Sequence, residues 1–404
     1  MADSSSGSIA DRLAELRGPV PPRHHDARTV AALTANPGCE RRAVLDAAGV
    51  DKRALAERIG FGPRFGQSPF AISRGNAFER LVKADGGTTL LRLLREELAL
   101  EFGGPEGDTA GDAGGAPGWV DLGEGDRAER HRRTRELVAA VSQGTDMQVA
   151  IADHPLLALD VGGRTAYVEP DLVALRARDG SWHLAEIKSF AMIDGRADPM
   201  KVAEAATQAA VYVLAFRALL EGLGLSAQLV STDIVLICPR DFTNTPAAAR
   251  VDVRRQIAAV RRQLERLPRV GELLGRLDAG VTFDLSRDEH GEPRHEAADL
   301  GKAVATIEAR YAPECVSRCD LAFYCRDEAR AAGSTDLLGR AVRDALGGVG
   351  TVRDALSLSR RPADDESVYE DADLAEAARL LSTARRARRD ALREAQNRFG
   401  EAAA

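Results

Sequence analysis

The chain has 404 residues, of which 44% are hydrophobic and 29% charged, and its formal net charge is −7 at pH 7. This composition is that of a folded protein with at least one large core, and it excludes a chain that is disordered throughout. The negative charge argues against coating of nucleic acid by bulk electrostatics, but it is compatible with a local basic groove. The apolar runs look too short to cross a bilayer and the N-terminus lacks the pattern of a signal peptide, so we expect a cytoplasmic protein without membrane contact.

Short helical patterns separated by Gly and Pro fill residues 1–70, and a longer helical pattern follows in "RGNAFERLVKADGGTTLLRLLREEL". Residues 103–126 are rich in Gly, Asp and Pro and hold few large apolar side chains. A segment of this kind cannot offset the entropy lost on ordering. We therefore expect a mobile insertion at about 103–128.

Strand patterns dominate from 155 to 190, in "LLALDVGG", "TAYVEPDLVALRA" and "SWHLAEIKSF". The last two are joined by "RDGS", in which Asp-Gly is a strong hairpin signal. A helix, "DPMKVAEAATQAAVYVLAFRALLEGLG", and an apolar strand, "STDIVLICPRD", follow. The order helix, three strands, helix, strand predicts an α/β core in which helices flank one mixed sheet.

An amphipathic helix is predicted over 253–267, because apolar residues recur there at steps of three and four. Arginines flank its apolar seam, so this helix is the best candidate for contacts with nucleic-acid phosphates; the alternative is an ordinary solvated face. From about residue 331 to 404 the chain is charged and helical in pattern, which predicts an added helical extension.

Lysine is rare in this chain, with five residues among 55 lysines and arginines, yet Lys188 lies on the apolar strand "HLAEIKSF". Residues two apart on a strand share a face, so Glu186 and Lys188 point the same way, and the hairpin brings Asp171 beside them. Two carboxylates with a backbone carbonyl, that of Ile187, suit Mg²⁺ or Mn²⁺. A lysine beside such an ion can hold or deprotonate the attacking water. The alternative is a simple Glu–Lys ion pair on an edge strand.

The order of "EPD" and "EIK" in a strand-turn-strand context resembles the PD-(D/E)xK nuclease superfamily, which implies a restriction-endonuclease-like core and phosphodiester hydrolysis on DNA. "RGNAFERLV" resembles the first helix motif of that superfamily, and the resemblance implies that Glu79 reaches toward the metal. The RecB-like branch often has a metal-binding histidine just before this glutamate, where this chain has Phe78.

Gln208 and Tyr212 match the Q-x-x-x-Y signature of the RecB-like branch, and the resemblance implies that both support the active site. Their spacing of four places them on one helix face. A plain core aromatic is the alternative for Tyr212.

Three cysteines lie close together in "ECVSRCDLAFYC", at Cys315, Cys319 and Cys325, and Cys39 lies far upstream. Thiols are kept reduced in the cytoplasm, so four of them are better suited to a zinc ion or an iron-sulfur cluster than to disulfides. Cys238 lies in an apolar strand and is expected to be a buried thiol. The seven histidines show no metal-ligand spacing.

One early cysteine, nuclease motifs and three late cysteines together resemble the iron-sulfur RecB-like nucleases, such as CRISPR-adaptation exonucleases and AddB-type helicase-nuclease subunits. The resemblance implies a 4Fe-4S cluster on the four cysteines, with Zn²⁺ as the alternative, closing a nuclease domain over 1–330. It also implies DNA repair, CRISPR adaptation or phage (antiviral) defence, with a helicase or another DNA-processing or defence subunit as partner. A non-catalytic DNA-binding or scaffold subunit with the same fold is the rival hypothesis.

Overall fold

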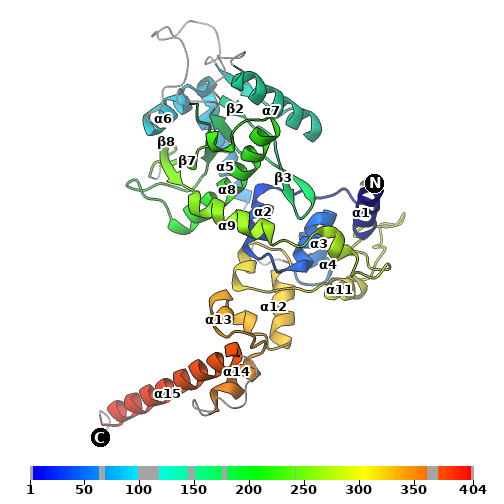
Figure 1. Cartoon of the computed structure of the whole chain (residues 1–404), viewed down its shortest axis with the longest axis vertical. Coiled ribbons are helices and arrows are strands. Elements are labelled where there is room, and N and C mark those ends of the chain that lie inside the picture. Colours follow the sequence, from blue (N-terminus) through cyan, green and yellow to red (C-terminus); the bar gives the residue numbers. More distant parts are fainter. Residues whose placement is uncertain are drawn as a thin grey trace. The chain divides into compact units, whose positions relative to one another are not determined.

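The computed structural model describes residues 3–62, 69–98, 118–143, 151–174, 180–241, 243–361 and 372–401, which form two compact units (Figure 1). Residues 1–50 and 64–294 form the first, here called the sheet unit. Residues 51–63 and 295–404 form the second, here called the helical unit. The two compact units divide at residue 294, and a short early segment belongs with the C-terminal part. The expected nuclease domain over 1–330 and extension over 331–404 stay predictions.

The sheet unit is built on a mixed six-stranded sheet with the strand order β1-β2-β5-β6-β7-β8, beside a two-stranded ladder of β3 and β4. The pairs β1–β2 and β6–β7 are parallel, and the other pairs are antiparallel. The strands are β1 (Trp119–Asp121), β2 (Ile151–Asp153), β3 (Leu157–Val161), β4 (Arg164–Val168), β5 (Leu172–Ala174), β6 (His183–Ile187), β7 (Asp233–Pro239) and β8 (Pro246–Asp252).

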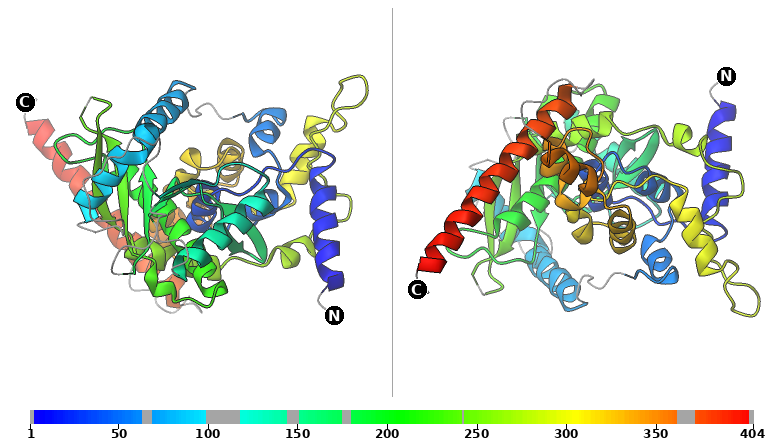
Figure 2. Two further views of the ribbon diagram at one scale, coloured as in Figure 1. Left: turned by 90° about the horizontal axis from the view of Figure 1, so that it is seen from above. Right: turned by 90° about the horizontal axis from the view of Figure 1, so that it is seen from below.

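Helices cover both faces of this sheet (Figure 2). On one face, apolar side chains of α5 (Pro69–Lys83) and α6 (Thr88–Leu98) pack against Ile187 and its neighbours on β5 and β7. On the other face, α8 (Pro199–Gly222) lies against β6, and the Phe216 ring meets the Trp182 ring edge-on with 5.4 Å between centroids. Alternation along β6 thus points Ile187 to one face and Glu186 to the other, as predicted.

Helix α8 is long and apolar enough to cross a bilayer by length and composition, and among the described residues it is the single helix of that kind. Sequence patterns did not single out this segment, because charged residues interrupt its apolar run. Its apolar window is 61% buried, in contact with β3, β6, α2 and α9. Such burial is the environment of a core helix.

The remaining helices of the sheet unit frame this core. They are α1 (Asp3–Arg17), α2 (Ala27–Ala35), α3 (Glu40–Ala48), α7 (Arg127–Ser142), α9 (Arg254–Glu265) and α10 (Val270–Leu274), with the 3₁₀ turns η1 (Ala84–Gly87) and η2 (Ala227–Leu229). Helix α9 is amphipathic as predicted, with Ile257 and Val260 buried toward α8.

The helical unit is helical in all its described elements, as expected for the C-terminal extension. They are α4 (Lys52–Arg58), α11 (Ala297–Ala305), η3 (Pro313–Ser317), α12 (Ala322–Ala331), η4 (Thr335–Leu338), α13 (Arg340–Ala345), α14 (Val352–Ser359) and α15 (Ala372–Glu401). An apolar cluster joins α14 to the first half of α15. Phe61 meets Tyr324 edge-on at 5.2 Å, which ties the early segment into this unit.

Three local predictions differ from the structure. The single strand expected in "TAYVEPDLVALRA" is two strands in different sheets, β4 and β5, because Pro170 cannot donate a ladder hydrogen bond and the chain changes direction there. Residues 119–121 of the expected insertion form the edge strand β1, while 99–117 lie outside the described residues.

The long helix expected after residue 74 is broken into α5 and α6 by η1. Gly87 there has a positive φ of +82°, and a Cβ at this position would lie 2.4 Å from the Trp119 ring. Only glycine fits this position.

Replacing Phe216 by Ala should lower the free energy of unfolding by about 3–5 kcal/mol, because it removes a fully buried ring between α8 and the sheet. Urea denaturation measures this. Phe70→Ala is the matched control, since its side chain is 86% exposed, and it should cost little. Equal losses in the two variants would show that α8 does not pack on the sheet as described.

Candidate functional site

Asp171, Glu186 and Lys188 converge at one end of the sheet, as the sequence predicts. Asp171 Oδ2 accepts a hydrogen bond of 2.7 Å from the backbone N–H of Ile187. The Lys188 ammonium donates a short hydrogen bond to Glu186 Oε2 and lies 3.9 Å from Asp171 Oδ2. The three side chains come from the start of β5 and the end of β6, which pair directly with each other.

The position of β6 excludes the simpler alternative of an exposed ion pair. β6 lies in the middle of the sheet, and the Glu186 side chain is 0% exposed. Its Oε1 atom has no hydrogen-bond partner among the described residues. Burying a carboxylate oxygen without a hydrogen-bond partner costs free energy, unless a bound ligand contacts that oxygen. The donor set of Asp171, Glu186 and the Ile187 carbonyl therefore fits a hard divalent cation such as Mg²⁺ or Mn²⁺.

Burial and mutual repulsion shift the ionisation of this group. Burial, followed by the charge of Asp171, raises the pKa of Glu186 to about 8. Burial also raises the pKa of Asp171, against the charge of Lys188. Burial alone would lower the pKa of Lys188, but the charges of Glu186 and Asp171 raise it to about 12. In the metal-free protein Lys188 is thus an ammonium, and Glu186 and Asp171 hold their protons more tightly than ordinary carboxyl groups do.

Gln208 and Tyr212 lie on the face of α8 that approaches this group. Gln208 Nε2 donates a hydrogen bond of 2.8 Å to Tyr212 Oη, as their spacing of four allows. Burial raises the pKa of Tyr212, and the charges of Glu186 and Asp171 raise it further, so the phenol is neutral and close to both carboxylates. Gln208 and Tyr212 can therefore help to orient groups at the two carboxylates by hydrogen bonding.

A cleft of about 440 Å³ opens beside Lys188 and Gln208. Its wall carries Arg28, Arg74 and Lys201 as well as Lys188, against the acids Asp26 and Glu204. The ring of Phe190 also lines it, with Lys201 Nζ 5.9 Å from the ring centroid. An excess of cations beside the carboxylates suits an anionic substrate such as a phosphodiester.

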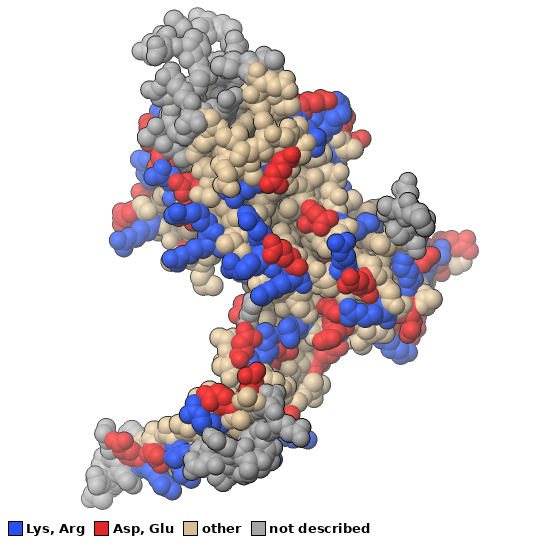
Figure 3. Space-filling view, in the orientation of Figure 1, with Lys and Arg blue, Asp and Glu red and all other residues tan. Residues whose placement is uncertain are grey.

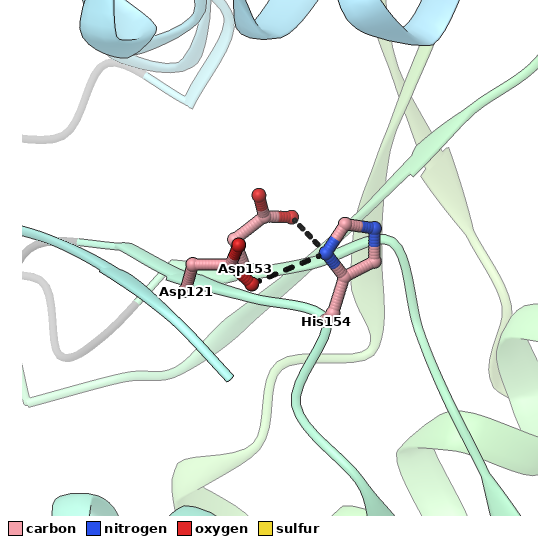
Figure 4. A group of neighbouring side chains, drawn as sticks. All are labelled: Asp121, Asp153 and His154. Carbon is pink, nitrogen blue, oxygen red and sulfur yellow. Dashed lines mark hydrogen bonds and ion pairs between the residues drawn. The ribbon is translucent and has the colours of Figure 1, made fainter. Parts of the chain in front are cut away.

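A second charged cluster, not predicted from the sequence, lies where α5 meets the edge of the sheet. Asp121 ends β1, Asp153 ends β2 and His154 follows it; their ligand-type atoms lie within 4.8 Å of one another (Figure 4). Such a group can take a metal ion. Lys83 from α5 also belongs to it, 2.6 Å from Asp153 Oδ1. We call these four residues together with Glu79 the Lys83 cluster.

Glu79 makes its charged side-chain contacts within the Lys83 cluster. Glu79 Oε1 is 2.6 Å from Lys83 Nζ and 3.4 Å from His154 Nε2. The hydrogen bond from His154 and the Lys83 ammonium lower the pKa of Glu79 to about 2, against burial. Its charge also raises the pKa of Asp171, so it is near the predicted metal ligands. Whether it reaches a metal, as the resemblance implies, stays a prediction.

His154 is one of four residues of this cluster that the sequence analysis missed. The hydrogen bond to Glu79 raises its pKa to about 9 against burial, and the charge of Asp153 adds to this. Its φ is +51°, an uncommon left-handed conformation for a non-glycine residue. Sequence signals existed in the Asp-His-Pro run at the end of a strand and in the i, i+4 spacing of Glu79 and Lys83.

The cysteines divide between the two units. Cys39 is the N-cap of α3 in the sheet unit. In the helical unit, Cys315 lies in η3, Cys319 in the turn that follows, and Cys325 in the first turn of α12. Their spacing thus places three thiols on consecutive tight turns. Cys238 is fully buried in β7, which confirms the expected buried thiol, and burial raises the pKa of this thiol to about 12.

Comparison with known proteins finds no family model, no curated protein and no solved structure that matches this chain.

Without added metal, the free energy of unfolding should fall as pH rises from about 5 to 8, and Glu186→Gln should weaken this fall. The raised pKa means that the folded state binds the Glu186 proton more tightly than the unfolded state does. Its contribution is therefore complete below the ordinary value near 4.5 and is lost as pH rises through about 8.

Urea denaturation in EDTA at several pH values measures this difference. Glu136→Gln, an exposed and ion-paired glutamate on α7, is the control and should follow the wild type. Parallel curves for wild type and Glu186→Gln would contradict the raised pKa.

Proposed function

We propose that this protein is a metal-dependent DNA nuclease of the RecB-like type that hydrolyses phosphodiester bonds. The observation that carries the proposal is the buried Glu186, whose Oε1 lacks a hydrogen-bond partner among the described residues, next to Asp171 and Lys188. A mixed sheet with α5 and α6 on one face and α8 on the other also supports a restriction-endonuclease-like core.

In this proposal Asp171, Glu186 and the Ile187 carbonyl hold Mg²⁺ or Mn²⁺, and Glu79 assists directly or through water. The bound ion would polarise the scissile phosphate and stabilise the charge that develops in the transition state. Lys188, an ammonium in the metal-free protein, orients the attacking water or a phosphate oxygen by donating hydrogen bonds. Gln208 and Tyr212 hold the surroundings of the two carboxylates in place.

The cleft beside Lys188 receives the cleaved strand in this proposal, and α9 offers a second basic surface. Figure 3 shows Lys and Arg side chains gathered over α9. Of its exposed arginines, Arg254 is paired with Asp252 at 2.5 Å, whereas Arg255, Arg262 and Arg266 follow one exposed face. Local positive charge of this kind permits phosphate contacts in a protein whose net charge is negative.

The four cysteines Cys39, Cys315, Cys319 and Cys325 hold a 4Fe-4S cluster in this proposal, with Zn²⁺ as the alternative. The three thiols on consecutive turns of the helical unit support it. The proposed setting is cytoplasmic DNA repair, CRISPR adaptation or phage defence, with a helicase or other DNA-processing subunit as partner.

Purified protein with Mg²⁺ or Mn²⁺ should cut labelled single-stranded or duplex DNA, and Lys188→Ala should lower the rate roughly 10²–10⁴-fold. Asp171→Asn and Glu186→Gln should lose cleavage because they lose charged metal ligands. Lys302→Ala, which removes a surface lysine of the helical unit, is the control and should cut like the wild type. A wild-type protein that cuts neither substrate with either ion would overturn the proposal, and equal rates for wild type and Lys188→Ala would overturn the role of the lysine.

Protein purified without oxygen should contain about four irons and absorb in the visible range if the cysteines hold a 4Fe-4S cluster. Cys39→Ala and Cys325→Ala should each lose iron and absorbance. Cys238→Ala is the matched control, because this thiol is buried in β7, and it should keep both. One equivalent of zinc without iron would favour the Zn²⁺ alternative. Absence of both iron and zinc would exclude a cysteine-bound metal centre.

A further inference from the structure

The Lys83 cluster already contains a cation at its centre. Lys83 Nζ lies 2.6 Å from Glu79 Oε1, 2.6 Å from Asp153 Oδ1 and 3.1 Å from His154 Nε2. The lysine side chain is 12% exposed, so this ammonium has left most of its water and is held by protein atoms. A compact point charge with three donors can approach several acceptors in this way, which a planar guanidinium cannot.

The atoms around this ammonium are those that bind a divalent ion. His154 Nδ1 lies 3.4 Å from Asp121 Oδ1 and 3.3 Å from Asp153 Oδ1 (Figure 4). Carboxylate oxygens with one imidazole nitrogen suit ions such as Mn²⁺. The cluster therefore has the donor set of a metal site and a lysine ammonium within it.

Charge counting shows why the cluster needs a cation. Asp121, Asp153 and Glu79 bring three carboxylates to the cluster, and Lys83 is the one lysine or arginine of the described residues that contacts two of them. Asp153 is 4% exposed, so loss of Lys83 would leave its carboxylate buried without its strongest partner. Removing one partner of a buried ion pair is costly because the remaining charge cannot regain water.

We propose that Lys83 is a positioning residue whose ammonium takes the place of a second divalent ion, so that the wild-type protein binds one catalytic ion and not two. The expected number of one ion in the wild-type protein rests on the proposed function, which places an ion at Asp171 and Glu186. Lys83 extends from α5 to the end of β2, so it also fixes Glu79 and His154 next to Asp171. The backbone N–H of His154 donates to the Asp171 carbonyl at 3.3 Å, which joins the cluster to the nuclease site.

The test counts Mn²⁺ ions bound at saturation in four proteins, by isothermal titration and by electron paramagnetic resonance of the free ion. They are the wild type, Lys83→Met, Asp171→Asn/Glu186→Gln, and the combination of all three substitutions. Methionine keeps the length and apolar stem of lysine without its charge. We expect one ion, two ions, none and one ion, respectively.

The design separates this inference from the proposed function. The inference requires one more ion in each protein with Lys83→Met than in its parent, whatever the parent binds. The proposed function requires one fewer ion when Asp171 and Glu186 are neutralised. No gain on Lys83→Met would overturn the inference, as would a second ion in the wild type that remains in Asp171→Asn/Glu186→Gln.

Folding of the variant is checked by its thermal midpoint. Lys83→Met should melt below the wild type in EDTA and should recover more of its midpoint than the wild type does when Mn²⁺ is added, because the ion replaces the lost charge. Lys302→Met is the control for lysine removal and should leave the ion count unchanged. A variant that stays destabilised and gains no ion would show that Lys83 has a structural role alone.

Discussion

The structure of the candidate site depends on a carboxylate buried in the middle of a sheet. Glu186 is fully buried between α8 and the strands on either side of β6, and the Lys188 ammonium is its one charged contact within hydrogen-bond distance among the described residues. Desolvation of such a pair often exceeds its Coulomb attraction, and apolar residues at the same positions are commonly as stable. Stability therefore does not explain this pair. A requirement for a carboxyl group at this point explains it better, and the unpartnered Oε1 points to the same requirement.

Lysine is scarce in the chain, and the three lysines of the sheet unit all lie at this end of the sheet. Lys188 contacts Glu186, Lys83 contacts Asp153 and Glu79, and Lys201 lines the cleft beside Lys188. Lys83 and Lys188, which are partly buried, each lie against carboxylates at hydrogen-bond distance. Arginine, which the chain uses elsewhere, has a wide planar head that suits bidentate surface pairs such as Arg254 with Asp252. The positions of the lysines indicate that this unit uses lysine where a compact cation must fit among oxygen atoms.

Local pattern was enough to place Asp171, Glu186 and Lys188 together, since they lie on or next to two strands predicted to form a hairpin. Gln208 and Tyr212 were placed at the site through the family resemblance. Local pattern was not enough for the Lys83 cluster. Asp121 and Asp153 meet because β1 pairs with β2, and both strands have three residues, too few to show a period. The grouping of the compact units depends on contacts of the same long-range kind. Residues 51–63 join the helical unit through contacts such as Phe61 with Tyr324, which are distant in sequence.

The two charged groups interact electrostatically, and they meet at the paired ends of β2 and β5. Asp153 pairs with Leu172 across β2 and β5, so His154 comes opposite Asp171, and the backbone bond between them fixes the separation of the two groups. The charge of Glu79 raises the pKa of Asp171, and that of Lys83 lowers it. A cation fixed in the Lys83 cluster therefore also favours the ionised form of Asp171, which is the form that binds metal. An ion there would act in the same direction but would have to be acquired from solution, whereas the lysine is supplied by the fold.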